Sequence, residues 1–467
     1  MSEPTAAGAT SQIAAWLASV DVQTIPDEVV GHARRLLLDH LAAVVIGSTT
    51  DVSKAIRAFA TEAYSGDQAT VVCGGRLSAP GAALVNGSAA HGFETDDGYT
   101  PGSVHPSAVV WPAVLAAAER HGIGFARALV AAAAGVELTC RIAEAGHPST
   151  WRNGFHNTPI AGVFGAAAGV AVLLGEADGT VAQALGIAGS HAGGLFAFLG
   201  QGAEVKRLHA GKAARDGLIS VDLARRGVTG PTDVLEAEKG YFSAFARNDW
   251  KQAALLGELG KRWAMLDTYL KPYPCCRHLH GPIDAVLALA ERNNLSIGDV
   301  RGVTVETYEV AAHHRRRDIA NVLDAQMSIP YAIAIALRDR EVGLTQFGRS
   351  ARSDARVRSL LERVDVVASD ELTRSYPAKR PARVSIECED GRRVAAVIGQ
   401  PLGEPSNPLS DDALARKARS LCTPVIGDER TEALISGVLT GEDLDGVLAG
   451  LCEDGGHRGG SPFAEGY

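Results

Sequence analysis

Aromatic side chains, paired cysteines and basic charge are all scarce in this sequence, and each shortage excludes a class of protein. Aromatic residues make up 5% of the 467 positions, so the core must be built mainly from aliphatic and small side chains. The formal net charge of −9 argues against nucleic acid as a partner, since a phosphate backbone requires a basic surface. A small anionic substrate is still allowed, because a local basic pocket can form on an acidic protein.

The seven cysteines are odd in number and form no CxxC pair, which argues against zinc-ribbon and disulfide frameworks. Thiols that stay reduced are typical of the cytoplasm, where we expect this protein to reside. The first 20 residues lack a basic segment followed by an uninterrupted apolar run, so a secretory signal is not expected. Apolar runs such as 161–175 are shorter than the roughly 20 residues of a membrane span. We therefore expect buried helices and no membrane partner.

Helical periodicity dominates the first part of the chain. Segment 25–48 has apolar residues at helical spacing and ends near a glycine, as helices often do. Between 80 and 265 one helical pattern follows another, each closed by a turn that contains glycine. No strand pattern rises above this background, so we predict an all-helical domain here.

The pattern changes after about residue 270. Segments 300–310, 364–370 and 382–399 alternate as strands do, the last around an Asp-Gly turn. A Pro-rich linker begins at 401, and helical patterns return after it. The predicted divisions are the first part of the all-helical domain, an α+β unit, a return to the helical domain and a disordered tail: 1–269, 270–400, 401–452 and 453–467.

The loop "HGFETDDGYTPGSVHPS" (91–107) gathers two histidines and three carboxylates directly before a helical run. His105 would lie near a helix N-terminus, which favours a bound anion and a neutral imidazole able to exchange a proton at pH 7. A metal site and an idle solvated loop are the alternatives. The acids follow no recognised ligand spacing. We hypothesise that Asp96 or Asp97 orients His105 and that no metal binds there.

Three more loops place a histidine or lysine at the start of an apolar helix. "GFHNTPIAGVFG" carries His156, and "EVKRLHAGKAARDG" carries Lys206 and His209. The densest segment is "LKPYPCCRHLHGPIDA", which contains Lys271, Cys275, Cys276, Arg277, His278 and His280. Four such loops could build a cationic pocket for an anion. A solvated face remains the alternative for Arg207 and Lys212, as does a buried apolar role for the adjacent cysteines.

Together these four segments resemble the MmgE/PrpD family, and "QMSIPYAIAIAL" and "NPLSDDAL" also fit its pattern. The resemblance covers roughly residues 10–450. The family includes 2-methylcitrate dehydratase, cis-aconitate decarboxylase and iminodisuccinate epimerase, which act on small di- or tricarboxylates without a metal or organic cofactor. It implies a mainly α fold, in which a smaller α+β lid domain is inserted into a large all-helical domain, a cleft between the two, and a homodimer.

The resemblance assigns catalytic roles to His105, His156, Lys206 and Lys271. It assigns substrate binding to Glu94, Asp96, Asp97, His209, Cys276, Arg277 and His278. Two positions depart from the family pattern: Glu94 and Gly98 stand where members usually have aspartate and threonine. Cys276 stands where the decarboxylases have histidine, and His278, His280 or Arg277 could substitute for it.

We therefore expect a cofactor-free lyase, either a dehydratase or a decarboxylase, that acts on a citrate- or aconitate-like acid. An epimerase of a substituted dicarboxylate such as iminodisuccinate is the first alternative. A non-catalytic scaffold or carboxylate-binding protein of the same fold is the second, and the loss of histidine at Cys276 is its best support. We expect the four catalytic residues to share one metal-free cleft.

Overall fold

The structure is a computed structural model that describes residues 8–200 and 203–452. The expected disordered tail, 453–467, lies outside these residues. The described chain forms two compact units. The first comprises 8–92, 96–269 and 414–452, and the second comprises 93–95 and 270–413.

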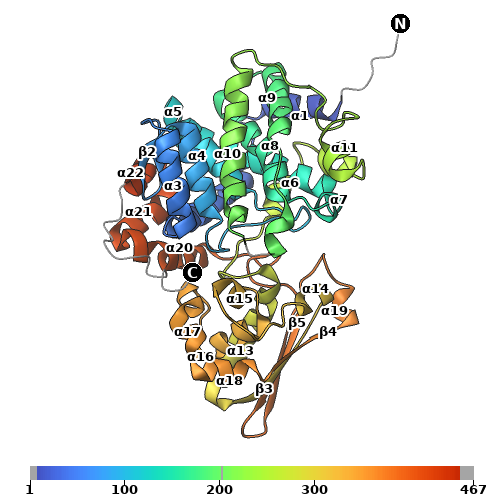
Figure 1. The fold of residues 1–467 in the computed structure, drawn as a ribbon, viewed down its shortest axis with the longest axis vertical. Coiled ribbons are helices and arrows are strands. Elements are labelled where there is room, and N and C mark those ends of the chain that lie inside the picture. The colour runs from blue at the N-terminus through green and yellow to red at the C-terminus, as the bar shows by residue number, and fades with distance from the viewer. Residues whose placement is uncertain (1–7, 201–202, 453–467) are drawn as a thin grey trace. The chain divides into compact units, whose positions relative to one another are not determined.

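The first unit is built almost entirely from helices, as the periodicity predicts, and its long helices are coloured blue to green in Figure 1. Up to residue 269 its α-helices are α1 (Ala9–Ser19), α2 (Asp27–Gly47), α3 (Asp51–Ala63), α4 (Ala79–Ala90), α5 (Ser107–His121), α6 (Phe125–Gly146), α7 (Ser149–Arg152), α8 (Asn157–Leu174), α9 (Asp178–His191), α10 (Val205–Ala224), α11 (Tyr241–Ala246) and α12 (Gln252–Leu256).

Small residues allow these helices to pack closely. A Cβ added at Gly165 of α8 would lie 1.8 Å from Thr139 Oγ1 and 2.5 Å from the Gly135 carbonyl oxygen of α6. Only glycine fits such a contact, which explains the abundance of small residues. Among the described residues, α8 is the helix long and apolar enough to cross a membrane, but 94% of its apolar window is buried inside the unit. It is a core helix, as predicted.

One element of the first unit was not predicted. Strands β1 (Ala69–Val71) and β2 (Gly75–Leu77) form an antiparallel hairpin. The prediction of a purely helical domain is therefore wrong at this place. Each strand has three residues, too few for an alternating pattern to stand out in the sequence.

The return segment packs on the N-terminal helices. It contains α20 (Asp411–Ile426), α21 (Asp428–Leu439) and α22 (Leu444–Cys452), drawn in red in Figure 1. Lys417 forms a buried ion pair with Asp39 of α2, and the amide of Cys73 donates to the Leu451 carbonyl at 2.8 Å. The first unit is thus closed by residues far apart in the sequence.

The second unit combines a four-stranded sheet with helices. Its strands are β3 (Val300–Thr307), β4 (Val364–Ala368), β5 (Ala382–Cys388) and β6 (Arg393–Ile398), in the order β4-β3-β5-β6. β3 pairs parallel with β4 and antiparallel with β5, and β6 pairs antiparallel with β5. All the strands predicted in this region are confirmed. Its α-helices are α13 (His280–Asn293), α14 (Glu309–Ala312), α15 (Val322–Gln326), α16 (Ile329–Asp339), α17 (Arg349–Ser353), α18 (Ala355–Leu361) and α19 (Asp370–Thr373).

Alternation along β5 forms the core of this unit. Ala382, Val384, Ile386 and Cys388 are buried, while the residues between them are partly exposed. The buried face joins apolar residues of α13 and α16 in one cluster. This core holds the short 3₁₀ helix η3 (Arg277–Leu279), which precedes α13 and carries predicted site residues.

Candidate acid–base site

The predicted site residues are divided between the two units. The first unit holds Asp96, Asp97, His105, His156, Lys206 and His209. The second unit holds Glu94, Lys271, Cys276, Arg277 and His278. Convergence of the two groups on one cleft stays a prediction.

The first unit gathers four imidazoles, here called the histidine cluster: His91, His105, His156 and His209. The ring centroid of His91 lies 5.1 Å from that of His105 and 6.2 Å from that of His156. His156 and His209 bring their Nδ1 atoms within 3.0 Å. The cluster therefore joins three of the predicted histidines with His91, which the sequence analysis did not assign to the site although it begins the loop that was singled out.

Local structure explains how the cluster is assembled. His91 follows the last residue of α4, and His156 is the N-cap of α8. His105 lies two residues before α5, and His209 lies in the second turn of α10. Each of these loop–helix junctions directs one ring into the unit.

The orientation of His105 is fixed by its own loop. Its Nδ1 lies 2.6 Å from the carbonyl oxygen of Asp97, and a carbonyl can only accept, so Nδ1 carries a hydrogen. The neutral ring then has its lone pair on Nε2. The Asp96 carboxylate is also close, with Oδ2 3.4 Å from this Nδ1 and 2.6 Å from Nδ1 of His91. One carboxylate thus supports two imidazoles.

Asp97 has a different role from Asp96. Its carboxylate accepts from the Ser107 amide at 3.3 Å and from the Ser107 hydroxyl at 2.8 Å, at the start of α5. Burial and the adjacent Asp96 raise the pKa of Asp97 well above its ordinary value. Asp97 therefore links the loop to α5 and positions His105 through its main chain.

Two members of the cluster are held neutral. Burial, followed by the charges of His91 and Lys206, lowers the pKa of His156 well below its ordinary value. Burial and His91 lower the pKa of His209 to about 4. Lys206 contributes to both shifts, so its ammonium acts on the cluster. The group can accept protons and neutralise an anion.

The two basic residues for which a solvated face was the alternative have structural partners. Arg207 pairs with Glu204 at 3.0 Å on the surface. Lys212 donates to the His191 carbonyl at 2.8 Å and lies 3.2 Å from Asp216 Oδ2. Neither contact involves the histidine cluster.

Lys271 is buried in the second unit, where its Nζ lies 3.4 Å from Glu94 Oε2. Glu94 has a positive φ of 57°, a conformation that few residues with side chains adopt. The departure from aspartate at this position thus provides a carboxylate that reaches the predicted catalytic lysine.

Cys276 contacts a residue that the sequence analysis missed. Its Sγ lies 3.8 Å from Nε2 of His314, which follows α14 and is 38 residues away in sequence. Burial acts to raise the pKa of the Cys276 thiol, but the hydrogen bond and charge of His314 outweigh it and lower that pKa. The pKa of His314 is raised in turn by the same contact, against burial. No sequence motif links the two residues.

The remaining predicted residues of this unit have internal partners. Arg277 donates to Glu404 Oε1 from Nη2 at 2.9 Å and to His280 Nδ1 from Nη1 at 2.7 Å. His278 Nδ1 lies 2.6 Å from the hydroxyl of Tyr308, which stacks on Tyr376. Arg277 therefore ties η3 to the segment around Glu404, and the guanidinium that was expected to bind substrate is engaged with the Glu404 carboxylate.

Among the described residues, one group could hold a metal ion. Ligand atoms of Cys276, His278 and His314 lie within 4.8 Å of one another. The contacts of Cys276 with His314 and of His278 with Tyr308 account for these side chains without an ion. The opening loop contributes no such group.

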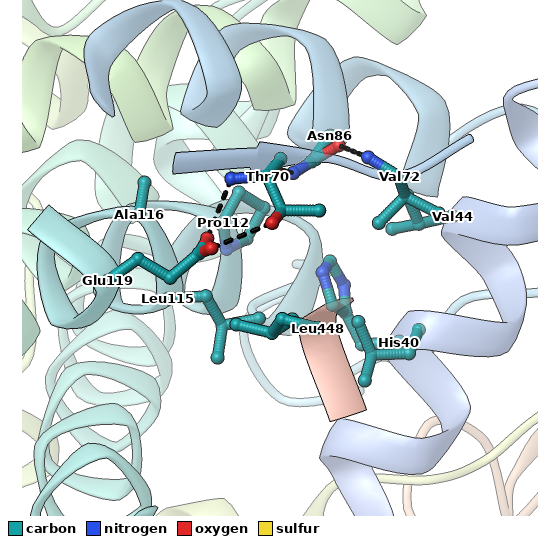
Figure 2. Close-up of a pocket in the computed structure, with 11 residues that line it drawn as sticks. His40, Val44, Thr70, Val72, Asn86, Pro112, Leu115, Ala116, Glu119 and Leu448 are labelled. Atoms are coloured by element: carbon teal, nitrogen blue, oxygen red, sulfur yellow. Dashed lines mark hydrogen bonds between the residues drawn. The ribbon is translucent and has the colours of Figure 1, made fainter. Parts of the chain in front are cut away.

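The pocket in Figure 2 is separate from the histidine cluster. It is lined by residues of the first unit that include His40, Thr70, Asn86 and Glu119. Glu119 accepts from the Thr70 amide and hydroxyl, each at 2.7 Å, and Asn86 accepts from Val72 at 3.0 Å. These hydrogen bonds tie the β1–β2 hairpin to α4 and α5, whereas the buried Nδ1 of His40 has no hydrogen-bond partner among the described residues.

Fold and site together describe a mainly α protein with a cluster of oriented imidazoles in one unit and a buried lysine in the other. The MmgE/PrpD N-terminal domain matches residues 11–253, and the MmgE/PrpD C-terminal domain matches residues 273–440. The chain belongs to the MmgE/PrpD family, as the motifs predict.

Named relatives cover almost the whole chain. The cis-aconitate decarboxylase-like protein oryM of Aspergillus oryzae is 31% identical over 94% of this chain and 96% of its own length. A cis-aconitate decarboxylase of Aspergillus terreus is 29% identical over 94% of each chain. The cis-aconitate decarboxylase of Homo sapiens is 26% identical over 93% of this chain and 92% of its own.

Proposed function

We propose that this protein is a lyase that decarboxylates a small cis-aconitate-like di- or tricarboxylate by acid–base chemistry. The observation that carries the proposal is the orientation of His105. Its Nδ1–H is held by the Asp97 carbonyl and Asp96 lies close by, so a neutral ring carries its lone pair on Nε2, the atom through which we propose that it exchanges a proton. Similarity to the named decarboxylases over more than nine-tenths of the chain supports the reaction class.

The chemical problem is to stabilise a carbanion next to a carboxylate that is already negative. Fixed positive charges and donors lower the energy of that state. In our proposal Lys206 and Lys271 bind the carboxylates, and the histidine cluster exchanges protons with the substrate carboxylates. The lowered pKa values of His156 and His209 keep both rings neutral at pH 7, so they offer hydrogen bonds to the substrate without a charge of their own.

A panel of carboxylic acids, assayed in the presence of a metal chelator, tests this proposal. We expect CO₂ release and a product with one carboxylate fewer, without added cofactor. Loss of water from a citrate-like acid, with no CO₂, would identify a dehydratase instead. Inversion at a substituted dicarboxylate would identify an epimerase.

Binding without turnover across the panel would favour the non-catalytic alternative. Calorimetry with the same acids measures this directly, and Lys271→Met and Lys206→Met should each weaken binding in that case. Activity that is lost to the chelator and restored by metal would overturn the metal-free proposal.

A further inference from the structure

Cys276 and His314 are a pair that the chemistry of the histidine cluster does not use. Nδ1 of His314 lies 3.1 Å from the carbonyl oxygen of Met327. Since a carbonyl only accepts, Nδ1 carries a hydrogen and the neutral ring presents its lone pair at Nε2. That atom faces Sγ of Cys276 at 3.8 Å, so the thiol donates to it or transfers its proton to it.

The backbone on both sides of the pair is fixed. The Cys276 amide donates to the Gln326 carbonyl at 2.9 Å, and the amide of Ile329 donates to the His314 carbonyl at 2.8 Å. Gln326 in turn donates from Nε2 to the Pro274 carbonyl at 2.7 Å. The ring of His278 stacks on that of His314, with centroids 5.3 Å apart. The positions of Cys276 and His314 are therefore fixed by contacts within the second unit.

We propose that Cys276 and His314 form a thiol–imidazole pair that donates the proton to the substrate carbon after CO₂ leaves. The proposal rests on the decarboxylation proposed above. It also answers an open question from the sequence: the imidazole lost at position 276 is supplied by His314, from a segment distant in sequence. His278, His280 and Arg277, the candidates that sequence offers, are engaged with Tyr308, with each other or with Glu404.

The proton balance is simple. The C–C bond to the carboxylate carbon breaks and CO₂ leaves. The electron pair of that bond stays on the neighbouring carbon. The proton held between Sγ and Nε2 forms the new C–H bond. A thiolate and a neutral imidazole remain, and the pair regains its proton from water.

Other charged or titratable groups act on the same thiol. The charge of Glu94 acts to raise the pKa of the Cys276 thiol, whereas the hydrogen bond from the His278 amide acts to lower it. Cys276 in turn raises the pKa of Tyr308, and Lys271 lies beside Glu94. The dominant partner of the thiol is His314, so removal of that ring is the informative change.

Alkylation of Cys276 by iodoacetamide, followed by mass spectrometry from pH 5 to 10, tests the pair without any substrate. We expect the half-maximal rate below the pH of about 8.5 at which an ordinary thiol ionises, and we expect His314→Gln to move it upward by about one unit or more. Exposed His313→Gln is the matched control and should leave it unchanged. Equal midpoints in the parent and His314→Gln, or a thiol that reacts at no pH, would overturn the proposal.

Turnover provides the second test. Cys276→Ala and His314→Gln should each lower kcat by about 10²-fold or more, the range of a lost general acid, and Cys276→His should restore part of it. Cys452→Ala, the other partly exposed cysteine among the described residues, is the control. Unchanged kcat in both variants of an active enzyme would overturn the role in protonation. A parent without turnover would count against the decarboxylation and against this role together, while the alkylation result still decides whether the pair exists.

A metal ion is the competing occupant of this place. Stoichiometric Zn²⁺ retained on the purified protein, with removal by chelator raising alkylation of Cys276, would show that the cluster is a metal site. That result would overturn the proton pair.

Discussion

At the scale of single residues, the chemical role of a side chain depends on which of its atoms already form hydrogen bonds. His105 illustrates this: its Nδ1 is fixed by the main chain of Asp97, and the carboxylate of Asp97 is used by Ser107. The hypothesis that Asp96 or Asp97 serves His105 gains a specific form, because Asp96 supplies the nearby charge and Asp97 supplies the hydrogen-bond acceptor.

His105→Ala should lower kcat by about 10²-fold or more, the scale of a lost general acid or base, while the melting temperature barely changes. Asp96→Asn should cause a smaller loss and a shifted pH–rate profile, because the charge beside Nδ1 is removed while the Asp97 carbonyl remains. Steady-state kinetics over a pH series measures both. Near-normal turnover of His105→Ala on the true substrate would leave the loop without a catalytic role.

The glycine at position 98, where family members usually have threonine, is explained by a close contact. A Cβ at this position would lie 2.4 Å from the hydroxyl oxygen of Tyr269, to which Gly98 is joined by backbone hydrogen bonds. Gly98→Thr, which introduces the usual family residue, should therefore destabilise the protein by about 1–3 kcal/mol through overpacking. Gly124→Thr is the control, since its Cβ would meet nothing within 4 Å. Chemical denaturation compares the two, and equal stability would contradict this explanation.

At the scale of elements, a buried ion pair joins α6 to the segment after α12. Arg141 is fully buried beside Glu137 and donates to the carbonyls of Gly257 at 2.9 Å and Arg262 at 2.7 Å. Glu137 also accepts from the Met265 amide at 2.8 Å. Two side chains of α6 thus hold the irregular segment after α12 through hydrogen bonds to its backbone.

Arg141→Met should cost about 3–5 kcal/mol of unfolding free energy, because Glu137 would be left as an uncompensated buried charge. Arg419→Met, which breaks a surface pair with Glu432, should cost about 1 kcal/mol or less. Urea denaturation of the two variants gives the comparison. The double variant Glu137→Leu/Arg141→Met should lose less than the sum of the two single changes.

At the scale of the whole molecule, buried neutral histidines make stability depend on pH. The pKa values of His40 and His209 are lowered by burial to about 3 and about 4, from an ordinary value of 6.5. Below pH 6.5 the unfolded chain binds protons that the folded chain does not. Their contribution is therefore complete above pH 6.5 and is lost as the pH falls toward 4 and 3.

We expect the urea midpoint to fall between pH 6.5 and 4, with fully buried His40 contributing up to a few kcal/mol, on the order of 1.4 kcal/mol per pH unit, and the less buried His209 contributing less. Asp97 acts in the opposite sense, since its raised pKa means that the folded state takes up a proton first as the pH falls. His209→Gln should reduce the pH dependence of the unfolding free energy by the share of about one proton. Exposed His313→Gln is the control. A flat profile over this range would contradict the assignment of these buried rings as neutral.

We also propose that the protein is cytoplasmic, from its cysteine pattern, and that it is a homodimer, from the family resemblance. Sedimentation equilibrium should then give twice the mass of one chain at micromolar concentration. A monomer over the whole concentration range would contradict this expectation.

Local pattern determined much of this protein. Apolar periodicity located helices such as α2 and α8, and alternation located β3 to β6. Loops before predicted helices singled out His105, His156, Lys206 and Lys271 as candidates. These features are encoded within 20 or so neighbouring residues, so the sequence displays them directly. Strands β1 and β2 were not predicted, because each has three residues and a pattern that short carries too little information.

Tertiary structure alone decided which side chains meet. It placed His91 in the histidine cluster, brought His314 to Cys276 across 38 residues, and gave the guanidinium of Arg277 to Glu404 across 127 residues. Such pairs form because a polar group removed from water needs a partner, and packing decides which partner is within reach. The sequence therefore specifies which groups can do the chemistry, whereas the folded chain decides which atoms are still available for it.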